Sequence, residues 1–209
     1  MTPSDGSPGA AATLADAKRR ATIEQILIRA RHLVITRGLD VTMDEIADGV
    51  GVGRRTLFRH FESRDRLLAQ ALEAGIQRYG EMLPAFSGDW RVWLRHVCES
   101  AHRMQAGYGP GYWELISRSD LPAEIAAVEE RRHALRQQAM TRIAQRLWIE
   151  AGGIGETPAC VHTGVTVYLS PRFTAAVTVD AEESWQIAAD LADSAIRRAI
   201  DRSVGVQAV

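Results

Sequence analysis

Apolar residues recur every three or four positions through most of this 209-residue chain, the spacing of helices that each bury one face. Near the N-terminus the pattern predicts a helix over 15–37 that ends at Gly38, and the capping-box spacing of Thr42 and Glu45 starts a short helix at Met43. Further helices are predicted at 54–60, 64–80, 90–105, 112–118 and 122–150, from 158 to a bend near Pro171, and from a second capping box at 180–183 to 203. We therefore expect an all-α protein of about nine helices.

The two short helices that begin at Met43 and Arg54 have the spacing of a helix-turn-helix. Only Gly51, Val52 and Gly53 separate them, so they must cross steeply. Small or apolar residues occur where the helices would touch, namely Ala47, Val52 and Leu57. The outer face of the second helix is therefore free to enter the major groove of DNA.

The outer face of the second helix carries the chemistry expected of a base-reading surface. Its residues are Arg54, Arg55, Thr56, Phe58, Arg59 and His60. Arg54 and Arg55 stand at the N-terminal end, where a guanidinium can bond bidentately to guanine. Thr42 and Arg64, at the starts of the flanking helices, are placed to hold the phosphate backbone on either side.

Charge is informative locally rather than over the whole chain. The formal net charge is −1, which does not indicate a nucleic-acid-binding protein. Within 52–66, however, five arginines stand against Glu62 and Asp65. A solvated surface is the alternative interpretation of these arginines, but the capped helix, the glycine turn and the basic face occur in one register, which favours DNA binding.

Residues 38–68, GLDVTMDEIADGVGVGRRTLFRHFESRDRLL, resemble the DNA-binding domain of the TetR family of repressors. The resemblance implies a homodimer that binds a palindromic double-stranded DNA operator. It also implies DNA contacts from Thr42, Arg55, Thr56, Phe58, His60 and Arg64. The chain departs from the family pattern with Gly53 in place of a serine cap, Arg64 in place of lysine, and Phe58 in place of a tyrosine that supplies a phosphate-directed hydroxyl.

The resemblance also predicts the organisation of the chain. It makes 14–62 the helix-turn-helix DNA-binding domain and 63–209 a larger helical domain for ligand binding and dimerisation. Residues 1–13 are small and polar with Pro and Gly, a composition that predicts a flexible tail. Helices between about 90 and 150 would enclose the pocket of an unidentified small-molecule effector, and those near 158–176 and 182–203 would form a four-helix dimer interface. The expected pocket residues are Trp93, Met104, Tyr112 and Trp113, with His102 or Glu114 as polar contacts. For any single one of them, ordinary core packing is the more common role of such a residue.

Several function classes lack support in the sequence. No catalytic motif and no metal-ligand spacing occurs, so we expect neither an enzyme nor a cofactor. The two cysteines, Cys98 and Cys160, form no disulfide framework, and no apolar run is long enough to span a membrane, so we expect a cytoplasmic protein without a membrane partner.

One alternative stays open from the sequence. The chain could be a DNA-binding architectural protein, or one controlled by a protein partner, whose aromatic C-terminal part only dimerises.

Overall fold

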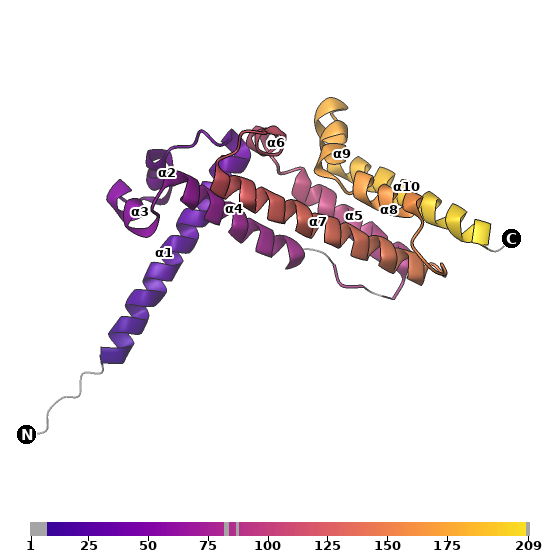
Figure 1. Cartoon of the computed structure of the whole chain (residues 1–209), viewed down its shortest axis with the longest axis horizontal. Coiled ribbons are helices and arrows are strands. Elements are labelled where there is room, and N and C mark those ends of the chain that lie inside the picture. The colour runs from indigo at the N-terminus through magenta and orange to yellow at the C-terminus, as the bar shows by residue number, and fades with distance from the viewer. Residues whose placement is uncertain (1–7, 82–83, 87, 208–209) are drawn as a thin grey trace, which may run out of the picture. The chain divides into compact units, whose positions relative to one another are not determined.

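A computed structural model describes residues 8–81, 84–86 and 88–207 of the chain (Figure 1). Every regular element in these ranges is helical, which confirms the all-α prediction. In chain order the helices are α1 (Pro8–Arg37), α2 (Met43–Val50), α3 (Arg54–His60), α4 (Arg64–Glu81), α5 (Trp90–Gln105), α6 (Pro110–Ser117), α7 (Ala123–Glu150), α8 (Ala159–Tyr168), α9 (Pro171–Ala175), the π-helical turn η1 (Ala176–Asp180) and α10 (Trp185–Gln207).

Local capping sets several helix ends where the sequence predicted them. The Thr42 hydroxyl accepts a hydrogen bond from the Glu45 N–H, and the Glu45 carboxylate accepts one from the Thr42 N–H, completing the capping box of α2. The Asp89 carboxylate accepts hydrogen bonds from the first backbone N–H groups of α5. Ser63 accepts one from Arg66 N at the start of α4.

Two helix starts differ from the prediction. α1 begins at Pro8 rather than near residue 15, because proline suits a first helical position and three alanines, the best helix formers, occupy positions 10–12. Residues 1–7 of the expected tail lie outside the described residues. The capping box expected at Asp180 is wrong, because Asp180 ends η1. The backbone carbonyl of Ser184 accepts the first hydrogen bonds of α10.

The helices form two compact units that do not follow the order of the chain. The first unit takes the chain as far as Gly75 and adds Gly109–Val128, whereas the second contains Ile76–Tyr108 and the chain from Glu129 onward. α4 and α7 therefore each give residues to both units.

In the first unit, α6 packs directly against the C-terminal end of α1. A Cβ atom on Gly111 would lie 2.0 Å from the Val34 carbonyl oxygen and 2.1 Å from the Gly38 nitrogen. The two backbones approach so closely that only glycine fits at this position. Tyr112 and Leu115, which follow on α6, are buried.

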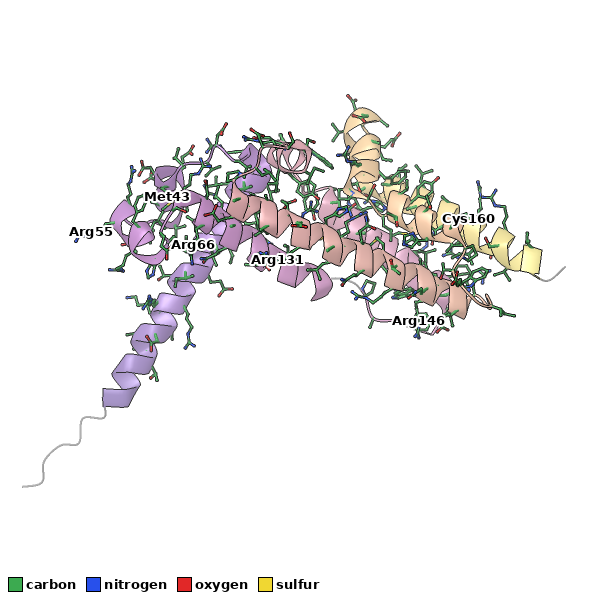
Figure 2. All side chains as sticks on the ribbon, viewed as in Figure 1. Met43, Arg55, Arg66, Arg131, Arg146 and Cys160 are labelled. Atoms are coloured by element: carbon green, nitrogen blue, oxygen red, sulfur yellow. The ribbon has the colours of Figure 1, made fainter. Side chains whose placement is uncertain are left out.

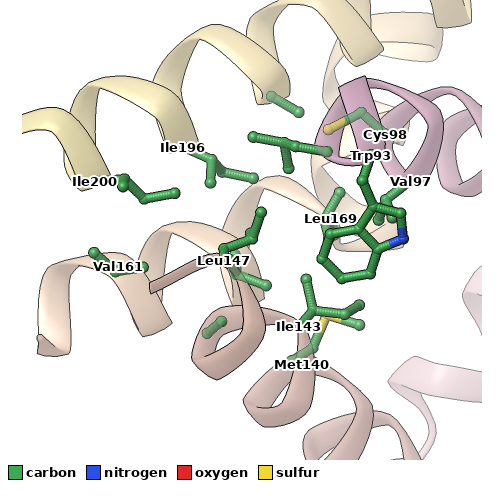
Figure 3. Close-up of a cluster of buried hydrophobic side chains, with 14 of the residues drawn as sticks. Trp93, Val97, Cys98, Met140, Ile143, Leu147, Val161, Leu169, Ile196 and Ile200 are labelled. Atoms are coloured by element: carbon green, nitrogen blue, oxygen red, sulfur yellow. The ribbon is translucent and has the colours of Figure 1, made fainter. Parts of the chain in front are cut away.

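The core of the second unit is formed by α5, α7, α8 and α10 (Figure 3). Leu94 and Val97 from α5 meet Leu147 from α7 and Ile196 from α10, all without exposed surface. Burying such side chains contributes about 1.5–3 kcal/mol each to folding. Cys98 lies in the same core, and burial raises the pKa of its thiol, so the cysteine is inert packing.

Candidate functional site

The turn between α2 and α3 has the geometry that a helix-turn-helix requires. Gly51 ends α2 with φ 71°, a left-handed conformation that glycine adopts without strain. Ala47 and Leu57 are buried, while Val52 in the turn is half-buried. Because Leu57 anchors α3 inward, the residues on its other faces are presented to solvent.

Arg54 is exposed, but its guanidinium already has partners. Its Nη1 donates a hydrogen bond of 2.7 Å to the Asp44 carboxylate on α2. The same guanidinium lies 5.4 Å from the centre of the Phe58 ring, one turn further along α3. Phe58, which is 46% exposed, therefore makes a cation–π contact with Arg54. It cannot form the phosphate-directed hydrogen bond of the tyrosine that is usual at this position.

Arg55 and Arg59 are exposed on α3, and within the described ranges neither makes a side-chain hydrogen bond or ion pair. Figure 2 shows Arg55 extending from the outer side of α3. Its five N–H donors are thus available for an external acceptor. Thr56 is half-buried, and its backbone N–H donates to the Gly53 carbonyl at 2.8 Å.

The expected phosphate-holding residues both have partners inside the first unit. The Thr42 hydroxyl donates to the Glu45 carboxylate at 3.0 Å while it caps α2. The backbone N–H of Thr42 and then the guanidinium of Arg37 hold the pKa of Glu45 below its usual range. Arg64 at the start of α4 forms an ion pair of 3.0 Å with Asp65. Their DNA contacts remain predictions.

His60 ends α3 in a half-buried position. Its Nδ1 is buried without a hydrogen-bond partner in the described part of the chain, and its ring stands edge-on to Phe61. Burial, followed by the positive charges of Arg59 and Arg19, lowers the pKa of His60, so the imidazole is neutral near pH 7.

The six expected pocket residues fall into two sets. Tyr112, Trp113 and Glu114 lie on α6 in the first unit, where Tyr112 and Trp113 stand edge-to-face at 5.3 Å. Glu114 is paired with Arg118 at 3.1 Å, and its carboxylate lies over Gly38 at the end of α1. These contacts give α6 a role in anchoring α1.

Trp93, His102 and Met104 lie on α5 in the second unit. Trp93 lines an open cavity of about 380 Å³ with Phe86, Ala139, Arg142, Ile143 and Arg146. The Arg146 guanidinium covers the Phe86 ring at 4.2 Å, and Phe86 packs edge-on against Trp93. Met104 is half-buried.

His102 belongs to a buried polar cluster. Its Nδ1 lies 2.8 Å from the Thr174 hydroxyl oxygen on α9, and that hydroxyl donates to the Gln105 side-chain oxygen. The Gln105 amide nitrogen donates to the Leu169 carbonyl at 3.0 Å. Burial lowers the pKa of His102 to about 4.

Sequence reasoning missed residues that long-range contacts bring to these sites. Asp44 gave no signal, because its contact with Arg54 depends on how α2 and α3 cross. Thr174 is 72 residues from His102, and no local pattern in the sequence indicates that the two side chains meet. Gln105 could have been found, since it follows His102 by three positions and so shares its helix face.

An exposed arginine face on the second of two short crossing helices is the arrangement that helix-turn-helix proteins use to bind DNA. Residues 26–71 match the family described as "Bacterial regulatory proteins, tetR family". In this segment, which holds the helix-turn-helix, the chain is similar to that family.

Solved structures agree on the fold. A tetR-family transcriptional regulator from Streptomyces coelicolor has a TM-score of 0.65 at 19% identity, over 86% of this chain and 79% of that one. A TetR transcription regulator from Haloarcula marismortui has a TM-score of 0.66 at 15% identity, covering 88% and 98%. NalD of Pseudomonas aeruginosa, the secondary repressor of the MexAB-OprM multidrug efflux pump, has a TM-score of 0.59 at 18% identity, covering 88% and 97%.

A comparison with curated proteins found no match. Within the described residues, no helix is both long and apolar enough to cross a membrane, and no three potential metal-ligating side chains gather at one place.

Proposed function

We propose that this protein is a ligand-responsive repressor that binds a palindromic operator as a homodimer in the bacterial cytoplasm. The observation that carries the proposal is Arg55, which is exposed at the N-terminal end of α3, has no ion-pair partner in the described part of the chain, and lies inside the tetR-family match. Arg55 and, once released from Asp44, Arg54 would read base edges, while Thr42, His60 and Arg64 would contact the backbone. NalD, a repressor with a similar fold, supports the sign of regulation.

An apolar strip on the second unit supports dimerisation. Ile187 and Leu191 lie one helical turn apart on α10 and are 40% and 50% exposed, and Val167 on the adjoining α8 is 49% exposed. Apolar side chains at such spacing typically pack against another helix. A second copy of the chain would cover them in a four-helix arrangement, and such a homodimer would carry one α3 helix for each half-site of a palindrome.

Responsiveness to a ligand is supported by a link along the chain. The buried cluster around His102 lies in the last turn of α5, and only four residues separate α5 from α6, which makes close contact with the end of α1. An effector that binds one position of α5 better than another would shift the population of DNA-binding conformations.

Selection of the purified full-length protein against a randomised duplex library at two salt concentrations tests DNA recognition. Enrichment of a palindrome is expected, since base-specific binding survives salt better than phosphate-driven binding. Salt-sensitive binding without enrichment would favour the architectural alternative, and absence of binding would contradict both.

Light scattering after size-exclusion chromatography tests the dimer. The wild type should have the mass of two chains, and Leu191→Glu should shift it toward one chain because a charge is costly in an apolar interface. Gln186→Glu places the same charge on another face of α10 and should leave the mass unchanged. A monomeric wild type would contradict the proposed homodimer.

A further inference from the structure

His102 Nε2 is a buried polar atom that the fold leaves without a partner. The residue has no exposed surface, and Nε2 makes no hydrogen bond within the described residues. Buried side-chain nitrogen atoms nearly always have a partner, so each exception calls for an explanation.

The neighbouring hydrogen bonds decide which ring nitrogen carries the proton. The Leu169 carbonyl can only accept, so the Gln105 amide nitrogen faces it and the Gln105 oxygen faces Thr174. The single hydroxyl proton of Thr174 points to that oxygen or to the Ser170 carbonyl at 3.4 Å, both of which are acceptors. Thr174 therefore accepts from His102, and the proton of the imidazole is on Nδ1.

A neutral imidazole with its proton on Nδ1 has a lone pair on Nε2. The only group that can satisfy this atom is a hydrogen-bond donor. A charged ammonium is a poor candidate, because a cation loses its hydration in a buried site and, among the described residues, no buried carboxylate joins this cluster.

The surroundings of His102 are aromatic and adjoin an irregular helix. The Phe173 ring stands edge-on to His102 with centroids 5.8 Å apart, and Tyr168 stands edge-on to Phe173 at 5.1 Å. Both of these rings are half-buried. Directly after α9, the backbone forms the π-helical turn η1, a conformation that is frequent at functional sites.

We propose that Nε2 of His102 accepts a hydrogen bond from the effector, and that the effector is a neutral aromatic molecule with a hydroxyl or N–H donor. This inference rests on the proposed function as a ligand-responsive regulator and adds the class of ligand. The ring of the effector packs against Phe173 and Tyr168, and its donor replaces the missing partner of the imidazole.

Two variants of His102 separate its nitrogen atoms. In His102→Asn the side-chain amide nitrogen takes the position of Nδ1, so the hydrogen bond to Thr174 is kept and the Nε2 acceptor is lost. In His102→Gln the amide reaches the position of Nε2, so an acceptor oxygen is kept and the bond to Thr174 is lost. Chemical denaturation checks that both variants fold.

Isothermal titration calorimetry of the full-length protein, without DNA, uses a panel of neutral phenols, naphthols and indoles, each paired with its O-methyl or N-methyl derivative. We expect at least one donor to bind the wild type about tenfold or more tightly than its methylated partner, the effect of roughly one hydrogen bond. His102→Asn should remove this difference and His102→Gln should retain most of it. Equal binding of donors and methylated partners, binding by no member of the panel, or a difference that survives in His102→Asn would overturn the proposal.

A second measurement does not depend on the panel. Long-range ¹⁵N–¹H correlation of the wild-type protein reports the protonated nitrogen of His102, and a proton on Nε2 would overturn the proposal directly. Operator binding by the unliganded wild type is measured separately. A failure there would count against the proposed function, whereas failure of the calorimetry with intact operator binding would count only against this site.

Discussion

Arg54 and Asp44 are joined by a hydrogen bond of 2.7 Å across the helix-turn-helix, so one of the two arginines at the start of α3 is neutralised by the protein itself. Arg55, its neighbour, has no such partner among the described residues. In the proposed DNA complex the two arginines would therefore differ: Arg54 would exchange a carboxylate for a base or phosphate, and Arg55 would exchange only water.

Asp44→Asn should strengthen binding to every duplex by about three- to tenfold at low salt, because it frees Arg54 and removes a negative charge that repels phosphate. Fluorescence anisotropy with operator and random duplexes measures this change. Glu156→Gln removes the same charge from the second unit and should alter affinity less than about twofold. Weaker binding by Asp44→Asn would mean that Asp44 positions Arg54 for recognition.

Arg55→Ala should cost about 1–3 kcal/mol on the operator and relax base preference at the contacted position, whereas Arg64→Ala should weaken operator and random DNA about equally. Competition between operator and random DNA for each variant measures how the loss of affinity divides between the two DNA types. Equal losses on both DNA types for Arg55→Ala would remove it from the base-reading set.

Gly111→Ala should lower the free energy of unfolding by about 2 kcal/mol or more, because its new methyl group meets the backbone of α1, which has no flexible end to move aside. Denaturant unfolding followed by circular dichroism measures the loss. Gly205→Ala on α10 meets nothing within 4 Å and should stabilise the protein by about 0.5–1 kcal/mol through helix propensity. A harmless Gly111→Ala would show that α6 and α1 can separate cheaply.

Acid should weaken the fold through His102. Its native pKa of about 4 lies below the ordinary value of 6.5, so between these pH values the unfolded chain binds a proton that the native protein does not. The free energy of unfolding should then fall by up to about 3 kcal/mol from pH 6.5 to pH 4. His102→Asn should lack this component and retain the smaller one from His60, whose pKa is shifted in the same direction. Identical pH profiles for the two proteins would contradict a neutral, buried His102.

The features that sequence analysis predicted correctly are those encoded within a few residues. The Thr42–Glu45 capping box, the Asp89 cap and the burial of Leu57 each depend on neighbours along one helix or one turn. The start of α10 shows the limit of that reasoning. A suitable spacing at 180–183 was outweighed by η1, which carries the helical backbone through Asp180.

The site residues that sequence analysis missed are held by contacts between distant segments. Asp44 reaches Arg54 only after α2 and α3 have crossed, and Thr174 reaches His102 only after α9 has packed on α5. No local pattern reports either pairing. The grouping of α6 with the first unit is of the same kind, since it depends on a glycine that permits backbone contact rather than on any apolar period.

The discontinuity of the first unit has a practical consequence for exchanging modules between regulators. A chimaera that joins the first 75 residues to a foreign sensing domain would leave behind α6, and with it the cover over Val34 and Gly38 at the end of α1. A transplant that includes Gly109–Val128 keeps this cover. The first unit can therefore be transferred to another protein only as two separate segments of the chain. The junctions of such a chimaera belong on either side of Gly109–Val128, although this segment lies within the second unit in the order of the sequence.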